Sequence, residues 1–157
     1  MIKKNIIKNN LVSHGSRSLK GIITPPGDKS ISHRALLFSS LALGKSQISN
    51  LLHSEDVLNM VKALKLLGIK ITKINNIFYV IGSGLTGFNI PKKHIDCGNS
   101  GTLARILIGA IGGSEIFVTL TGDESLRTRP MNRVIKPLEK MGINFHSSNG
   151  LLPLIVY

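Results

Sequence analysis

Apolar residues recur along the chain at two spacings, and their alternation predicts a mixed protein of helices and strands. Apolar side chains three or four residues apart indicate one face of a helix, and short runs rich in Ile, Val and Leu indicate strands. Helices are expected after Ser30, after Ser54, at residues 102–111 and after Pro130. Strands are expected at residues 19–24, 47–52, 69–73, 77–81, 95–97 and 116–121, and from residue 143 onward.

Local signals mark the ends of these helices. Ser and Thr side chains cap helices by accepting a backbone N–H bond, so Ser30 and Thr102 are expected as caps. Pro130 is expected at a first helical position. Gly44, Gly68 and Gly142 are expected to end the first, second and fourth helices. The apolar stripe of the first helix is expected to consist of Ile31, Ala35, Phe38 and Leu41.

The second half of the chain repeats the pattern of the first. Residues 34–37 align with 105–108, and residues 63–69 align with 137–143. The shift exceeds the roughly 20 to 50 residues of solenoid repeats, so it indicates duplicated strand-helix-strand-helix-strand-strand units. The expected fold class is α/β or α+β.

Composition is that of a folded chain. Of 157 residues, 42% are hydrophobic and 18% are charged, a balance too apolar for a disordered segment. No apolar stretch approaches the roughly 20 residues of a membrane span, and the first residues lack the apolar core of a signal peptide. We therefore expect a cytoplasmic protein.

The net charge predicts an anionic ligand. Lys and Arg number 20 against 8 Asp and Glu, which gives +12. Part of this charge lies in Asn-, Ile- and Lys-rich segments that look like a compositional bias. Aromatic residues for base stacking are few, with five Phe, two Tyr and no Trp, which favours small anions over nucleic acid. The single Cys97 cannot form an internal disulfide and is expected to be buried.

The first candidate anion site follows the Pro-Pro-Gly turn that ends at Gly27. A helix N-terminus offers free N–H groups to an anion, and Ser30 and Arg34 share one helix face beside Lys29. The alternative is a capped surface helix with solvated charges. A P-loop is excluded because its Gly-x-x-x-x-Gly-Lys-Ser/Thr spacing is absent.

The second unit repeats this arrangement. Asn99 and Gly101 form a turn, Thr102 begins a helix, and Arg105 lies one turn later. The alternative is an ordinary Asn-Ser-Gly turn. Arg129, before the fourth helix, is placed to reach across to this segment.

Three further residues have less specific signals. Asp56, at the start of the second helix, is either a simple cap or a partner that orients Lys29. His33 and His53 have no metal-ligand spacing and are expected to be structural.

These segments together resemble the 5-enolpyruvylshikimate-3-phosphate (EPSP) synthase family. The resemblance spans nearly all of residues 16–146 in the family's order. The related UDP-N-acetylglucosamine enolpyruvyl transferases, which have Lys-Asn where this chain has Lys29-Ser30, are the second choice. The segments that carry the resemblance are Pro26-Gly27-Asp28-Lys29-Ser30-Ile31-Ser32-His33-Arg34, Gly98-Asn99-Ser100-Gly101-Thr102 and Leu120-Thr121-Gly122-Asp123 with Arg129-Pro130-Met131.

The resemblance implies enolpyruvyl transfer from phosphoenolpyruvate to the 5-hydroxyl of shikimate 3-phosphate, with release of phosphate and without a metal or cofactor. A glycine at position 101 implies sensitivity to the herbicide glyphosate. The implied site residues are Lys29 and Asp56 for catalysis, Lys29, Asn99, Gly101 and Arg129 for phosphoenolpyruvate, Lys29, Ser30 and Arg34 for shikimate 3-phosphate, and Thr102 and Arg105 as support at the helix start.

The chain departs from the family in length. Family members are monomers more than twice as long, with two lobes that each contain three repeats of an inside-out barrel. By this comparison residues 1–21 belong to the other lobe, and residues 22–157 form a partial lobe with two repeats. Proton-transfer groups of the other lobe are missing, so we expect the isolated chain to be inactive and to need a C-terminal half.

Two other functions remain open at this point. The chain could be a non-catalytic phosphate-binding module. A small basic nucleic-acid-binding domain is also conceivable, but this alternative depends only on the net charge.

Overall fold

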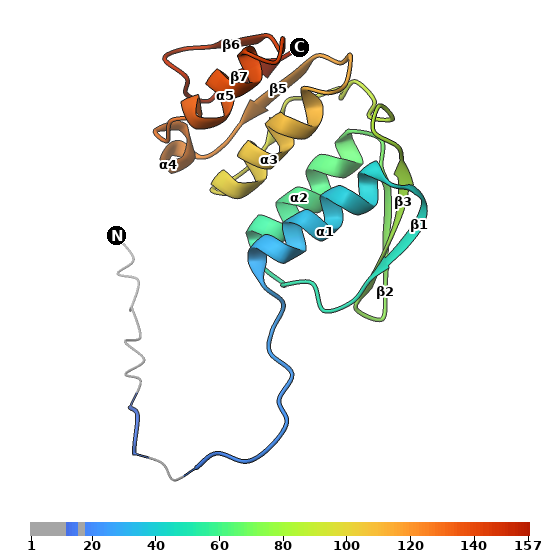
Figure 1. Cartoon of the computed structure of the whole chain (residues 1–157), viewed down its shortest axis with the longest axis vertical. Coiled ribbons are helices and arrows are strands. Elements are labelled where there is room, and N and C mark those ends of the chain that lie inside the picture. The colour runs from blue at the N-terminus through green and yellow to red at the C-terminus, as the bar shows by residue number, and fades with distance from the viewer. Residues whose placement is uncertain (1–11, 16–17) are drawn as a thin grey trace, which may run out of the picture.

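The computed structural model describes residues 12–15 and 18–157, and Figure 1 shows how helices and strands alternate in it. This mixture agrees with the expected α+β class. The helices are α1 (Lys29–Leu41), α2 (Glu55–Leu66), α3 (Gly101–Ile111), α4 (Glu124–Arg127) and α5 (Asn132–Glu139). The strands are β1 (Leu43–Ile48), β2 (Lys70–Ile74), β3 (Ile77–Ser83), β4 (Ile95–Asp96), β5 (Val118–Thr121), β6 (Phe145–Ser147) and β7 (Leu154–Val156).

The strands form two sheets, one in each half of the described chain. The first has the order β1-β3-β2 and is antiparallel throughout. The second has the order β4-β5-β7-β6, in which β4 runs parallel to β5 and the other pairs are antiparallel. In its centre, Leu120 lies between Ile95 and Leu154, and all three side chains are fully buried.

The helices join the two sheets through one apolar core. Helix α1 packs on β3 and on α2, and α3 contacts α1, α2 and α5. The buried residues of both halves belong to a single cluster, in which Leu36, Leu64 and Leu107 have no exposed surface. Burial of such leucines contributes about 1.5–3 kcal/mol each to folding, so the two halves stabilise each other.

Two of the expected helix caps are each wrong by two residues. Helix α1 is capped by Asp28, whose Oδ1 accepts a 2.7 Å bond from the Ile31 N–H, so Ser30 lies inside the first turn. Helix α3 is capped by Ser100, whose Oγ accepts from the Leu103 N–H, and Thr102 lies inside that helix. In each case the earlier side chain has the oxygen that reaches the third N–H.

The expected apolar stripe of α1 is half right: Ala35 and Leu41 pack against the core, but Ile31 and Phe38 do not. Ile31 and Phe38 are 64% and 62% exposed, whereas the buried residues of α1 include His33, Leu36 and Leu37. Both sets are spaced at a helical period. Contacts with α2, α3 and β3 decide which set faces the core.

The remaining differences concern strands and the last helix. Residues 18–28 form no strand, the strand expected at 47–52 begins earlier as β1, and the final expected strand begins at Phe145. The fourth expected helix is α5, which begins at Asn132, two residues after Pro130, and the short helix α4 before Pro130 is not expected from the sequence. The second unit therefore has the expected order with one extra short helix, and the first begins with α1.

Other expectations hold. Helix α2 begins directly after Ser54, and its apolar residues Val57, Met60, Val61 and Leu64 are buried. The hairpin strands β2 and β3 lie within two residues of their expected bounds. The expected leader falls largely on residues 1–11 and 16–17, outside the described residues. In the part that is described, no helix is long and apolar enough to cross a membrane.

Candidate functional site

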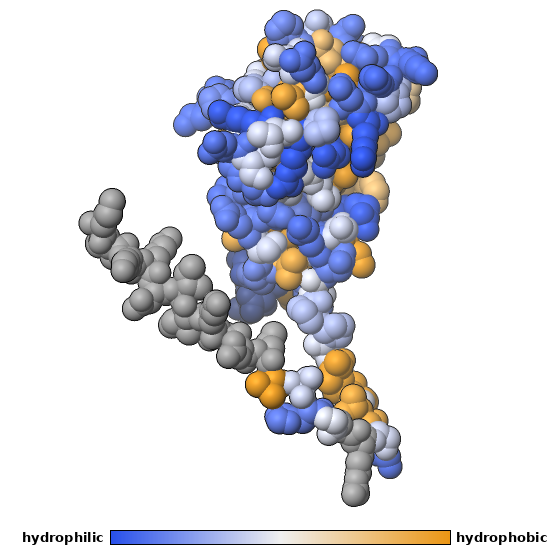
Figure 2. All heavy atoms as spheres, turned by 90° about the vertical axis from the view of Figure 1, so that its left-hand side faces the viewer, coloured by the Kyte–Doolittle hydropathy of each residue, from blue (hydrophilic) through white to orange (hydrophobic). Residues whose placement is uncertain are grey.

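The N-terminal ends of α1, α2 and α3 lie on the same side of the molecule (Figure 1). Figure 2 views the molecule from this side, and the surface there is largely hydrophilic. The helix N-termini carry partial positive charge, which stabilises an anion near them. Side chains at these three ends form two groups.

The Lys29 group consists of Lys29, Ser30 and Arg34 from α1 and Asp56 from α2. Lys29 Nζ donates to Asp56 Oδ2 at 3.1 Å, and about half of the lysine side chain is exposed. Ser54 caps α2 through a 3.4 Å bond from the Val57 N–H. Asp56 is therefore a partner of Lys29 and not the cap. Ser30 is half-buried and Arg34 is exposed one turn later.

The Asn99 group lies at the start of α3. Asn99 Nδ2 donates a 2.7 Å bond to Asp123 Oδ2, and Arg129 Nη2 donates to Asn99 Oδ1. Arg129 also donates to the Asn99 carbonyl at 3.4 Å and to Ser125 Oγ at 3.1 Å. The segment before α5 thus reaches the turn before α3, as the sequence predicts for Arg129.

Gly101 and Arg105 complete the Asn99 group. A Cβ on Gly101 would lie 2.7 Å from Arg105 Nη1 and 3.6 Å from Arg129 Nη1. Arg105 is half-buried and donates a 3.3 Å bond to the Pro130 carbonyl. The absence of a side chain at Gly101 therefore allows the Arg105 guanidinium to lie close to this backbone, with that of Arg129 nearby. Thr102 lies in the first turn of α3, half-buried.

The turn that presents Asn99 is packed against α2. Gly98 has a φ of 56°, which favours glycine, and a Cβ there would lie 2.5 Å from Asn59 Nδ2. The Asp123 N–H bonds the Gly98 carbonyl at 2.9 Å. The position of Asn99 is therefore set by both α2 and the segment before α4.

Asp123 and Ser125 belong to this site but were not singled out from the sequence. The hydrogen bond from Asn99 and the bond from the Leu126 N–H hold the pKa of Asp123 below its usual 3.8, and Arg129 and Arg127 add to this effect. Asp123 also caps α4. An Asp followed by Glu124 is a helix-start signal, which could have marked this short helix.

Cys97 and the histidines are not arranged as metal ligands. Cys97 is fully buried, and burial, with Asp96 nearby, raises the pKa of its thiol to about 12. His53 is exposed near Lys73 Nζ, whereas His33 is buried between α1 and α3. Within residues 12–15 and 18–157, no three His, Cys, Asp or Glu side chains gather as a metal site.

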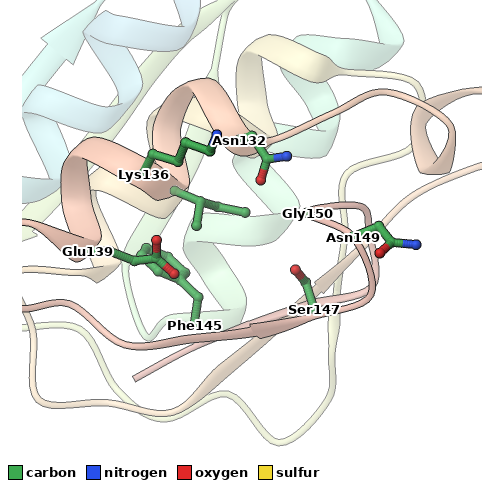
Figure 3. A pocket seen from close by; sticks show the side chains of 8 residues that line it. Asn132, Lys136, Glu139, Phe145, Ser147, Asn149 and Gly150 are labelled. Atoms are coloured by element: carbon green, nitrogen blue, oxygen red, sulfur yellow. The ribbon is translucent and has the colours of Figure 1, made fainter.

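A separate hollow of about 500 Å³ lies between α5 and β6. Figure 3 shows Lys136 and Glu139 of α5 on one side and Phe145 and Ser147 of β6 on the other. None of the residues predicted for the anion site lines it.

Comparison with known proteins identifies the family. Residues 13–157 match the family model described as EPSP synthase (3-phosphoshikimate 1-carboxyvinyltransferase). The chain is 47% identical over 146 residues to the 3-phosphoshikimate 1-carboxyvinyltransferase of Afipia carboxidovorans, a match that covers 92% of this chain and 33% of that protein. It is 45% identical to that of Thermodesulfovibrio yellowstonii, covering 94% of this chain and 35% of that protein.

A solved structure agrees with this match. EPSP synthase from Acinetobacter baumannii superposes with a TM-score of 0.81 at 35% identity, and the alignment covers 90% of this chain and 33% of that one. The chain thus spans about a third of the length of the relatives it matches. On the match over residues 13–157, the chain belongs to the EPSP synthase family.

Proposed function

We propose that this chain supplies the N-terminal part of the site of an enolpyruvyl transferase. The reaction moves the enolpyruvyl group of phosphoenolpyruvate to the 5-hydroxyl of shikimate 3-phosphate and releases phosphate. The observation that carries the proposal is the gathering of the Lys29 and Asn99 groups at three helix N-termini, in a chain of this family. Both substrates are anions, and cationic groups at helix N-termini are suited to bind them.

Phosphoenolpyruvate binds to Lys29, Asn99, Gly101 and Arg129 in this proposal. The guanidinium of Arg129 can bind a phosphate or carboxylate in a bidentate manner, and Asn99 holds that guanidinium in place. Gly101 lets the Arg105 guanidinium lie against the helix start, where a Cβ would collide with it. Arg105 and Thr102 support the helix start behind it.

Shikimate 3-phosphate binds to Lys29, Ser30 and Arg34. Ser30 and Arg34 are four residues apart on α1 and so lie on one face of its first turns. Asp56 orients the ammonium of Lys29, which lies at the meeting point of the two substrates. Lys29 and Asp56 are the residues of this chain assigned to catalysis.

Turnover requires more than these residues. The enolpyruvyl group must gain a proton and the attacking hydroxyl must lose one, and each such transfer needs a positioned acid or base. The carboxylate of Asp56 accepts a hydrogen bond from Lys29, and that of Asp123 accepts one from Asn99. We therefore expect the isolated chain to bind substrates without converting them.

The family's architecture suggests how the chain is organised. Residues 22–157 would form two of the three repeats of one lobe of an inside-out barrel, and residues 1–21 would belong to the other lobe. Two β/α units and a match to a third of each relative's length support this division. A C-terminal half would supply the rest of the site.

Calorimetric titration of the chain with shikimate 3-phosphate tests the binding role. We expect weak binding that is lost in Arg34→Gln and retained in Arg133→Gln, a matched control on the exposed side of α5. Absence of heat with the unchanged chain would refute the proposal. Equal loss in both variants would indicate only a general charge effect.

A non-catalytic phosphate-binding module is the second candidate. It is favoured because the carboxylates of Asp56 and Asp123 already accept hydrogen bonds from Lys29 and Asn99. Co-expression with the remaining two-thirds of Acinetobacter baumannii EPSP synthase separates the two functions. Phosphate release that depends on Lys29 would support the transferase. Substrate binding without phosphate release would support the module.

A further inference from the structure

His33 is a buried polar residue at the junction of the two substrate-binding groups. It lies in the second turn of α1 and has no exposed surface. Its Nδ1 is 2.8 Å from the carbonyl oxygen of Lys29, and its Nε2 is 3.3 Å from Ser100 Oγ. Ser100 stands between Asn99 and Gly101 in the chain and is itself 1% exposed.

The partners determine which ring nitrogen carries the proton. A carbonyl oxygen only accepts, so Nδ1 must be the donor to Lys29. In the neutral ring Nε2 is then an acceptor, and the Ser100 hydroxyl donates to it. Ser100 Oγ in turn accepts the 3.2 Å bond from the Leu103 N–H that caps α3. Each group in this chain of hydrogen bonds therefore donates to the next, from the Leu103 N–H in α3 to the Lys29 carbonyl in α1.

The neighbouring residue, Ser32, connects α1 to the segment before α2. Ser32 is 2% exposed, and its Oγ accepts a 3.0 Å bond from the Leu52 N–H, two residues before the cap of α2. Consecutive buried residues of α1 thus hold the segments that begin α2 and α3. A leucine could fill the space of His33, but it could not form these directional bonds.

We propose that His33 is a positioning residue that fixes the Asn99 group relative to the Lys29 group. Through Ser100 it sets the orientation of the turn that carries Asn99 and Gly101, while its other nitrogen is anchored on Lys29. The inference rests on the proposed function, because it assigns both groups to one pair of substrates. Loss of the bond to Ser100 weakens ligand binding in a chain that stays folded.

Two variants remove the bond from opposite ends. His33→Leu removes both imidazole bonds, and Ser100→Ala removes the hydroxyl. Each is expected to weaken binding of phosphoenolpyruvate and of shikimate 3-phosphate about three- to tenfold, as loss of one net hydrogen bond would. The double variant should be no weaker than the worse single variant, because both break the same link. Ser100→Thr keeps a hydroxyl and should restore most of the affinity.

Affinity is measured by calorimetry well below the unfolding temperature of each variant, so that loss of stability alone does not change it. Nitrogen-15 NMR of the imidazole provides a readout independent of substrates. We expect a protonated Nδ1 and an unprotonated Nε2 in the unchanged chain, with a shift of the Nε2 resonance in Ser100→Ala.

The outcomes distinguish the inference from the proposed function. If the unchanged chain binds neither substrate, the proposed function fails and the positioning role fails with it, whatever the NMR result. If the unchanged chain binds but both single variants bind equally well, only the positioning role is overturned. Additive effects in the double variant, or a protonated Nε2, would also overturn it. If His33→Leu does not fold, Ser100→Ala and Ser100→Thr still decide the question.

Discussion

Replacing Asn99 with alanine tests the network that holds Arg129 in the site. The Asn99 side chain accepts from Arg129 Nη2 and donates to Asp123 Oδ2 at 2.7 Å, and alanine removes both bonds. Arg129 keeps its longer bonds to the Asn99 carbonyl and to Ser125 Oγ. We expect weaker binding of phosphoenolpyruvate because the guanidinium is less firmly held.

The size of the effect follows from the exposure of the site. A hydrogen bond to a charged group contributes about 1.5–3 kcal/mol, and the low end applies because Asn99 is exposed to water. A difference of about 1.4 kcal/mol is tenfold in a dissociation constant. Affinity for phosphoenolpyruvate should therefore fall about tenfold in Asn99→Ala.

The same substitution should raise the pKa of Asp123. The bond from Asn99 is the largest cause of its lowered pKa, so its removal moves the pKa back toward 3.8. A carboxyl whose pKa is lowered by folding stabilises the fold above its unfolded-state pKa, and this stabilisation is lost as pH falls through the folded-state pKa. In the variant the stabilisation is smaller, and its loss on acidification is complete at a higher pH, because the folded-state pKa is higher.

Two measurements check these expectations. Calorimetry gives the affinity for phosphoenolpyruvate, and carbon-13 NMR of the Asp123 carboxyl gives its titration. Asn144→Ala, at an exposed asparagine next to β6, is the control and should change neither. An affinity within twofold of the unchanged chain, together with an unmoved Asp123 titration, would refute the role assigned to Asn99.

Three further predictions concern other parts of the site and core. Gly101→Ala places a Cβ 2.7 Å from Arg105 Nη1. In an active complex of this chain with the remaining two-thirds of an EPSP synthase, this change should weaken inhibition by glyphosate, and unchanged inhibition would contradict the role assigned to Gly101. Asp56→Asn should lower the free energy of unfolding by less than about 1 kcal/mol in urea titration, because its ion pair with Lys29 is partly exposed. The same variant should still weaken shikimate 3-phosphate binding, and a large loss of stability with intact binding would argue against an orienting role. The Cys97 thiol, with a pKa of about 12, should not react with a thiol reagent at pH 8 until denaturant is added, and rapid reaction of the folded chain would show that it is accessible.

Elements with a strong local signal could be predicted from the sequence. Helix α2 begins after Ser54 and its apolar residues from Val57 to Leu64 are buried, because both features depend on residues within a few positions of each other. Helix α1 shows the limit of this reasoning. Phe38 and Leu37 both fit a helical stripe, and only packing against the neighbouring helices and β3 decides that Leu37 is buried.

The candidate site was predictable as a set of residues but not as an arrangement. The Gly-rich, basic segments pointed to Lys29, Asn99 and Arg129, and the structure then joined residues 27 and 30 positions apart along the chain. Asp123 was missed because its role depends on the hydrogen bond from Asn99, across a separation of 24 residues. For His33 the sequence predicts only a structural role, because no local pattern indicates the bond to Ser100.

By itself, the sequence determined the class of fold, the basic segments at two helix starts that we propose bind anions, and the resemblance to the EPSP synthase family. These follow from local periodicity, charge and motif order. Only the tertiary structure decided that Asp56 partners Lys29, that Asn99 holds Arg129, and that His33 joins the two groups. Hydrogen bonds between segments far apart in sequence form only when packing brings the helix starts together. Local sequence patterns do not specify which helix starts come into contact.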